Sequence, residues 1–205
     1  MKTIPFECKV DNETLYCLAN DWEKGKYRYS LELSRTVTPN NTILVVGINP
    51  GGKTDPEKSY FGLTVRRLCN LVMGKDHDDK NHDSALLVNL TPVITLVPSG
   101  LKNYKIEPYH KKNIEVIKSL IQERHDRIHN VLFCFGSSFK YGKELFPEVI
   151  REITEELPSA QYWCFGLSRE DYPIHPLARV GNMNMKKCKL ELRTLCNFSY
   201  STEIE

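Results

Sequence analysis

Four short, continuous apolar runs constrain the fold of this chain more than any other feature of its sequence. They cover residues 43–47, 85–90, 131–136 and 162–166. A strand that is apolar on both sides is buried on both faces, as in a parallel sheet that helices cover. Helical patterns separate the runs, and their one-sided apolar positions are Val65, Leu68, Cys69 and Val72, then Ile114, Ile117, Leu120 and Ile121, and then Phe146, Val149, Ile150, Ile153 and Leu157. The alternation predicts an α/β fold of three layers with right-handed crossovers.

The length of the chain favours one domain. Its 205 residues suffice for one sizeable core, whereas domains commonly have about 100 to 200 residues each. We therefore expect a single domain over residues 1–205, with a β extension at residues 1–40 and a core at residues 41–180. Within the extension, Tyr27, Tyr29, Leu31 and Leu33 alternate with polar residues, a period of two that predicts an antiparallel lead-in or edge strand with one apolar face.

Composition and hydropathy limit the classes of protein that remain. No apolar run approaches the roughly 20 residues of a membrane span, and the first residues lack the apolar stretch of a secretory signal. We expect a cytoplasmic protein with no membrane contact, whose seven cysteines are reduced. The absence of a C-x-x-C pair argues against a metal site, and we expect no cofactor. A net charge of +2 neither requires nor excludes a nucleic-acid partner, and no obligate protein partner is evident.

Polar residues and glycines gather where the apolar runs end, which is where open α/β sheets bind ligands. The first run ends in Gly47-Ile48-Asn49-Pro50-Gly51, Asn89 lies near the end of the second, and His175-Pro176 follows the last. Asn89 can read the edge of a base, and His175 can donate a hydrogen bond to an oxygen that becomes negative during a reaction. In isolation, each also fits a structural role in a turn or at the surface. The glycine patterns of dinucleotide-binding and phosphate-binding loops are absent.

Taken together, these motifs resemble the uracil-DNA glycosylase superfamily. Gly47-Ile48-Asn49-Pro50-Gly51 is similar to the first motif of the mismatch-specific uracil and thymine-DNA glycosylases, and Leu87-Val88-Asn89 to the base-reading strand of the superfamily. His175-Pro176-Leu177 resembles its histidine-proline motif. The chain is more similar still to a little-characterised bacterial and phage family of unknown function within that superfamily. The residues that carry this second resemblance are Tyr27-Arg28-Tyr29, Asn49-Pro50, Thr64-Val65-Arg66-Arg67, Asn89-Leu90, Gly136 and Tyr172-Pro173 to Leu177.

The resemblance implies a fold and a set of roles. The fold would be a three-layer α/β/α sandwich around a central, mainly parallel four-stranded sheet of the uracil-DNA glycosylase type. Asn49 and His175 would be catalytic, with Asn49 placing the attacking water or the sugar and His175 stabilising the departing base. Base binding would fall to Gly47, Ile48, Pro50, Gly51, Phe61 and Asn89, with Phe61 stacking on the flipped base. DNA would be bound by Arg66, Arg67, Leu177, Arg179, Lys186 and Lys187.

The implied function is that of a DNA glycosylase. Such an enzyme flips a damaged, mismatched or modified base, here of the pyrimidine class, and hydrolyses its N-glycosidic bond, in DNA repair or in phage–host defence. Two alternatives stay open: a catalytically idle member of the fold that binds DNA or a nucleotide, and a hydrolase or transferase of free nucleosides. Joint placement of Asn49, Asn89 and His175 in one cavity would favour the enzyme, because a protein that only binds does not need all three.

Overall fold

The computed structural model describes residues 2–10, 13–51, 54–74, 82–95, 98–103, 105–142, 144–178, 186–187, 189–192 and 198–201. The strands are β1 (Thr3–Val10), β2 (Glu13–Glu23), β3 (Tyr27–Ser34), β4 (Thr42–Gly47), β5 (Ser84–Asn89), β6 (Ile128–Phe133), β7 (Gln161–Cys164), β8 (Lys186–Lys187), β9 (Lys189–Leu192) and β10 (Phe198–Ser201). The α-helices are α1 (Leu63–Met73), α2 (Glu107–Gln122) and α3 (Phe146–Glu156). Each of the four apolar runs forms a strand, β4 to β7, and each helical pattern forms a helix.

One mixed sheet of eight strands organises the molecule, in the order β1-β2-β3-β5-β4-β6-β7-β8. Strands β5, β4, β6 and β7 run parallel to their neighbours in this group. Strands β1, β2 and β3 form antiparallel pairs, and β3 then pairs antiparallel with β5, with Ser30 opposite Val88. Strands β9 and β10 form a separate antiparallel pair.

The expected fold class is therefore wrong. The sheet is not a central four-stranded, mainly parallel sheet of the uracil-DNA glycosylase type with a β lead-in, because antiparallel pairings outnumber parallel ones in it. Residues 1–40 do not form an appendage, since β3 makes a full ladder with β5 from Ser30 to Ser34. The physical reason is that apolar patterning reports the burial of a strand but not its partner in the sheet.

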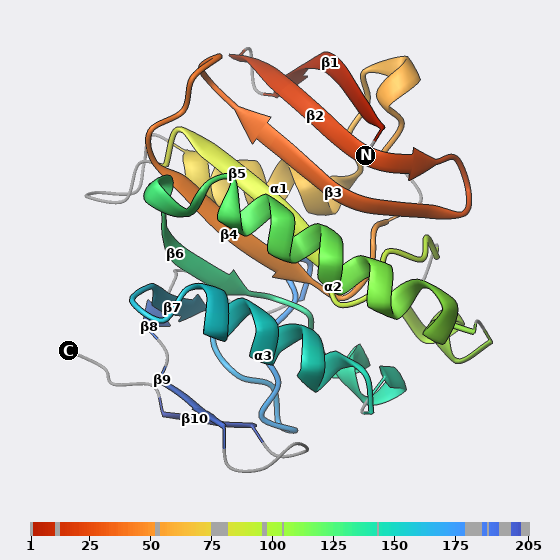
Figure 1. Cartoon of the computed structure of the whole chain (residues 1–205), viewed down its shortest axis with the longest axis vertical. Helices are drawn as coiled ribbons and strands as arrows, with labels where there is room; N and C mark the ends of the chain where they lie inside the picture. The colour runs from red at the N-terminus through yellow and green to blue at the C-terminus, as the bar shows by residue number, and fades with distance from the viewer. Residues whose placement is uncertain are drawn as a thin grey trace.

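Helices cover the two faces of the sheet unequally (Figure 1). Helices α2 and α3 pack side by side on one face, over Leu44, Val46, Leu86 and Val88. Helix α1 covers the other face, over residues that include Val45 and Leu87. Among the helices of the described segments, none is long and apolar enough to cross a membrane.

Strand β3 changes the face on which its apolar residues lie. The rings of Tyr27 and Tyr29 pack towards α2, where Lys112 lies 4.9 Å from the centre of the Tyr29 ring. Leu31 and Leu33 instead belong to the core under α1. Successive residues of a regular strand alternate between faces, so these four should share one. The expected single apolar face is wrong, and the switch turns Arg28 towards the α1 side, where it lines a cavity.

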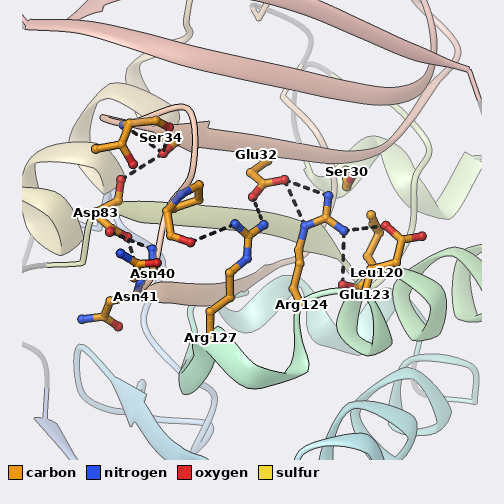
Figure 2. Close-up of polar contacts among 12 residues, drawn as sticks. Ser30, Glu32, Ser34, Asn40, Asn41, Asp83, Leu120, Glu123, Arg124 and Arg127 are labelled. Carbon is orange, nitrogen blue, oxygen red and sulfur yellow. Dashed lines mark hydrogen bonds and ion pairs between the residues drawn. The ribbon is translucent and has the colours of Figure 1, made fainter.

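An ion-pair cluster lies near the other end of β3 (Figure 2). The buried carboxylate of Glu32 accepts hydrogen bonds from Nε and Nη2 of Arg124, at 3.0 and 2.9 Å, and from Nη2 of Arg127 at 2.7 Å. Both arginines follow α2 in the chain, so the cluster ties the end of that helix to the sheet. Arg127 also donates to the carbonyl of Pro39 at 3.2 Å. Removing one member of a buried ion pair lowers the stability of the fold strongly, because the other charge stays buried without a partner.

Candidate functional site

A cavity of about 220 Å³ lies at the edge of the sheet where β4 and β5 end. Strand β3 begins at the same edge because it runs antiparallel to β5. The first turn of α1 and the segment after β7 complete the wall. The lining residues are Arg28, Val45, Gly47, Ile48, Asn49, Gly51, Thr54, Gly62, Leu63, Thr64, Val65, Leu68, Leu87, Val88, Asn89, Cys134, His175, Pro176 and Leu177. Asn49, Asn89 and His175 therefore come together, although they lie far apart in the sequence.

The segments after β4 and β5 run beside each other and fix Asn49. The backbone N–H groups of Leu90 and Thr91 donate to the carbonyls of Gly47 and Ile48, which extends the parallel pairing beyond the strands. The Asn49 amide nitrogen donates to Oγ1 and to the carbonyl of Thr95, at 2.9 and 3.3 Å. A carbonyl can only accept, so these contacts identify the nitrogen of the amide and leave Oδ1 as an acceptor. Asn49 can orient a water molecule but cannot take its proton.

Asn89 presents its amide to the cavity from the last position of β5. Its side chain is only 6% exposed, and it forms no hydrogen bond within the described part of the chain. The backbone carbonyl of Asn89 accepts from the buried Asn113 amide of α2 at 2.9 Å, which holds the strand end in place. Gly47 makes room for this amide, because a Cβ at Gly47 would lie 2.8 Å from Asn89 Oδ1. A buried amide with free donors and acceptor is ready to bind a polar planar group.

His175 enters the cavity as a neutral hydrogen-bond donor. The backbone N–H of Leu177 donates to His175 Nδ1 at 3.1 Å, so the proton of the neutral ring resides on Nε2. Burial lowers the pKa of His175, which keeps the ring uncharged at neutral pH. Gly136 has a φ of +71° and packs against the histidine, since a Cβ there would lie 3.2 Å from His175 Cβ. This contact brings the segment after β6 against the segment after β7.

Arg28 adds a positive charge to the cavity wall. Its side chain is 3% exposed, and Nε and Nη1 are sealed from solvent with no hydrogen-bond partner among the described residues. Burial lowers the pKa of Arg28 to about 10, so the guanidinium still carries its charge at neutral pH. The described lining contains no aspartate or glutamate. The described part of the cavity wall therefore carries a net positive charge.

The amino-terminal turn of α1 faces the same space. Leu63, Thr64 and Val65 line the cavity, and no side chain caps the helix. Thr54 Oγ1 accepts from the N–H of Gly62, at 3.3 Å, before the helix begins. The first N–H groups of a helix have no partner within the helix and carry a partial positive charge. Two large apolar side chains, Leu63 at 64% and Leu177 at 40% exposed, stand at the rim.

Cys134 also lines the cavity but is not suited to nucleophilic attack. Burial raises the pKa of its thiol to about 12, so the reactive thiolate is absent at neutral pH. Its Sγ lies 3.5 Å from the carbonyl of Val46. Within the described residues there is also no group of three or more histidine, cysteine, aspartate or glutamate side chains that could hold a metal ion.

Some of the expected site residues line the cavity and others lie outside it. Gly47, Ile48, Gly51 and Leu177 line the cavity together with the three polar residues. Phe61 does not, and the expectation that it stacks on a base there is wrong: it is 1% exposed and packs edge to face on Phe6 in the core under α1. Pro50 is buried outside the lining, and Arg66 and Arg67 lie exposed on α1 outside it. Arg179 and the side chains of Lys186 and Lys187 lie outside the described residues.

Comparison with known proteins identifies a family. Residues 28–177 match the family described as "Protein of unknown function (DUF1643)". The chain belongs to the DUF1643 family. No curated protein and no solved structure matches it. The part shared with DUF1643 begins at Arg28 and ends at Leu177, so it includes each described residue that lines the cavity. The DUF1643 match carries no activity, and the resemblance to the uracil-DNA glycosylase superfamily stays a hypothesis.

One residue of the cavity wall in this DUF1643 protein is not predicted as a site residue from the sequence. Arg28 belongs to the motif Tyr27-Arg28-Tyr29, which carries part of the resemblance but assigns Arg28 no role in a site. One local signal was present: an arginine flanked by two tyrosines in a strand is an unusual candidate for burial. Its place in the cavity depends on the pairing of β3 with β5 and on the change of face within β3, neither of which the alternation pattern contains.

Proposed function

We propose that this protein is a DNA glycosylase that flips a base, of the pyrimidine class, into the cavity and hydrolyses its bond to the sugar. The observation that carries the proposal is the convergence of Asn49, Asn89 and His175 on one cavity. The volume of about 220 Å³ suits a single substituted ring, since a cavity of about 150 Å³ holds a benzene-sized molecule. Around that ring, the Asn89 amide can donate and accept, Asn49 Oδ1 can accept, and the neutral His175 ring can donate a hydrogen bond from Nε2.

The chemistry follows from what each group can do. The bond between C1′ and the base nitrogen breaks, and its electron pair leaves with the base. His175 donates its Nε2 proton in a hydrogen bond to the base oxygen on which negative charge develops. Asn49 Oδ1 accepts from the water that attacks C1′, and that water loses its proton to solvent. Since no group here is a strong base, the stabilised departure of the base supplies most of the acceleration.

The exposed residues at the mouth of the cavity favour a DNA duplex as the substrate. Base flipping leaves a gap in the stack, and an apolar side chain that enters it keeps the base outside. Leu63 and Leu177 are exposed leucines beside the mouth of the cavity, which is where such a wedge is needed. Arg66 and Arg67 lie exposed on the same helix as Leu63, within reach of a duplex seated there.

A cytoplasmic location belongs to the same proposal. Five cysteines of the described residues, Cys8, Cys17, Cys69, Cys134 and Cys164, are buried thiols. Free thiols are typical of a reducing compartment, which is where an enzyme that acts on a bacterial or phage genome works.

A panel of duplexes tests the proposal. Each duplex contains one modified pyrimidine, and each modified pyrimidine is placed in turn opposite each of the four bases. We expect the wild-type protein to leave abasic sites, seen as strand breaks after alkali, on at least one member of the panel. His175→Ala should then lower the single-turnover rate by on the order of 10²- to 10³-fold, the effect of one lost oxyanion donor. Duplex affinity in gel shifts should change little, because the donated bond strengthens only as the base departs.

His125→Ala is the matched control, since His125 is an exposed histidine on a 3₁₀ turn outside the cavity lining. It should leave the rate unchanged. Two results would overturn the proposal: no strand breaks on any duplex, or equal losses of rate and affinity in His175→Ala, which would make the histidine a binding residue of an inactive protein.

A further inference from the structure

The unpaired guanidinium of Arg28 is the polar group in the described structure that most needs a partner. Nε and Nη1 are sealed from solvent without an acceptor, and the side chain is 97% removed from solvent, with 3% exposed. A buried charge without a partner destabilises the folded state, as happens when a buried ion pair loses one member. The folded state bears this cost within a cavity wall rather than within the core.

Two other partly buried arginines, Arg124 and Arg127, pair with a carboxylate of the chain. On the same strand, Glu32 receives three hydrogen bonds from Arg124 and Arg127. Arg28 lies four residues earlier and has no acid beside it, since desolvation is the single cause of its lowered pKa. A neighbouring carboxylate would raise that pKa instead. Among the residues that the structure describes, Arg28 thus has no carboxylate partner.

A second feature points to the same kind of partner. The first turn of α1, an 11-residue helix, lines the cavity at Leu63, Thr64 and Val65 and has no side-chain cap. Helix amino termini bind anions through free N–H groups and the helix dipole. Arg28 and this helix end stand in the wall of one cavity that contains no described acidic residue. Both favour negative charge, and they are independent of each other.

We propose that Arg28 and the amino-terminal turn of α1 form an oxyanion-binding subsite in the cavity. The group that binds there is a carboxylate or phosphate of the ligand, held by the positive charge of the guanidinium and by the free N–H groups of the first turn of α1. A carboxylate would belong to an acidic ring that occupies the cavity, and a phosphate would belong to a nucleotide. The subsite goes beyond base excision, because it requires an anionic ligand whether or not a glycosidic bond is cleaved.

Matched ligands test the subsite on the wild-type protein. Benzoate and benzamide have the same shape and differ in charge, and inorganic phosphate provides the second oxyanion. At constant chloride concentration, we expect benzoate or phosphate to raise the melting temperature and to bind in calorimetry at least ten-fold more tightly than benzamide. Stabilisation by benzoate identifies an acidic ring as the source of the anion, and stabilisation by phosphate alone identifies a nucleotide. Equal binding of benzoate and benzamide without any effect of phosphate would overturn the proposal.

Variants separate the subsite from general charge effects. Arg28→Gln should remove the anion-dependent rise in melting temperature, and without ligand it should melt at or above the wild-type temperature, because an unpaired buried charge is gone. Arg169→Gln removes an exposed arginine outside the lining and should keep the full response. Arg28→Lys keeps a positive charge but shortens the side chain and changes the position of the charge, so it should bind the oxyanion more weakly than the wild type. An anion response that survives in Arg28→Gln would place the binding elsewhere and overturn the proposal.

These outcomes are distinguishable from those of the glycosylase test. Oxyanion binding that depends on Arg28, without excision from any duplex, would support the subsite and refute the proposed enzyme. Excision without any oxyanion response would do the reverse.

Discussion

The pair formed by Gly47 and Asn89 shows how strictly a single position can be set by its neighbour. Gly47 has no unusual backbone angle to explain its identity; its role is to leave space. A Cβ there would lie 2.8 Å from Asn89 Oδ1, a separation that real Cβ atoms essentially never show. The amide would have to rotate away from the cavity or the strands would have to separate.

Gly47→Ala should therefore disturb the amide and lower stability. We expect a loss of about 1–3 kcal/mol in the free energy of unfolding, the usual effect of added volume in a packed site, and weaker discrimination between bases by any excision activity. Urea denaturation measures the first and the duplex panel the second. Gly51→Ala is the stability control, because a Cβ at Gly51 meets nothing within 4 Å. Equal stability of the two variants would contradict the close contact with Asn89.

Residues of the site could be predicted where chemistry is local. Asn49, Asn89 and His175 stood out because each follows or ends an apolar run, and the ends of parallel strands meet at one edge. Phe61 was misplaced because an aromatic residue near a loop suits a pocket and a core equally well. Arg28 was missed because its position depends on a strand paired across the sheet, and such pairing leaves no trace in the local pattern.

At the scale of elements, the Glu32 cluster joins the end of α2 to β3. Its carboxylate is 5% exposed, and it neutralises two arginines that flank the turn after α2. Arg28 lies towards the opposite end of the same strand, where it lines the cavity and has no such ion pair among the described residues. Strand β3 is thus held firmly at one end and carries an unpaired charge at the other.

Glu32→Gln should remove the carboxylate partner of Arg127 and leave Arg124 with Glu123 alone. We expect the free energy of unfolding to fall by about 3–5 kcal/mol, as when one member of a buried ion pair is removed. Chemical denaturation provides the measurement. Glu115→Gln, on the exposed side of α2 at 63% side-chain exposure, should change the same quantity by less than about 0.5 kcal/mol. A similar small change for Glu32→Gln would show that solvent replaces the arginine contacts.

Elements themselves were largely predictable, and their arrangement was not. Strands β4 to β7 and the three helices follow from apolar runs and helical periodicity, which act over a few residues. The sheet order follows from contacts between distant segments, so the antiparallel pairing of β3 with β5 and the resulting mixed sheet were not foreseen. Strand β3 also reverses the side of its apolar residues, whereas the alternation pattern assumes a regular strand.

For the molecule as a whole, the buried histidine of the cavity links stability to pH. Burial lowers the pKa of His175 below its ordinary value of 6.5. Just below pH 6.5 the unfolded chain therefore binds a proton at this position more readily than the folded protein does. The free energy of unfolding must fall as the pH drops from that value towards the lowered pKa. Above pH 6.5 this residue contributes no dependence, because the ring is neutral in both states.

His175→Gln should reduce this loss of stability on acidification. Urea midpoints measured at about pH 7.5 and pH 5.5 should differ less in the variant than in the wild type, since glutamine does not titrate over this window. His125→Gln, which removes an exposed histidine, should retain the wild-type difference. An unchanged pH dependence in His175→Gln would mean that the ring is protonated as easily in the folded protein as in the unfolded chain.

The cavity is lined first by Arg28 and last by Leu177 in chain order, with β4, α1 and β5 between them. During synthesis, at about 5–20 residues per second, Arg28 therefore emerges on the order of ten seconds before His175. By the end of that interval the nascent chain contains Arg28, Asn49 and Asn89 but still lacks His175. A polypeptide released early by a stop codon or by cleavage before His175 could not assemble the complete pocket. Only translation through that histidine produces a chain able to carry out the chemistry proposed for it.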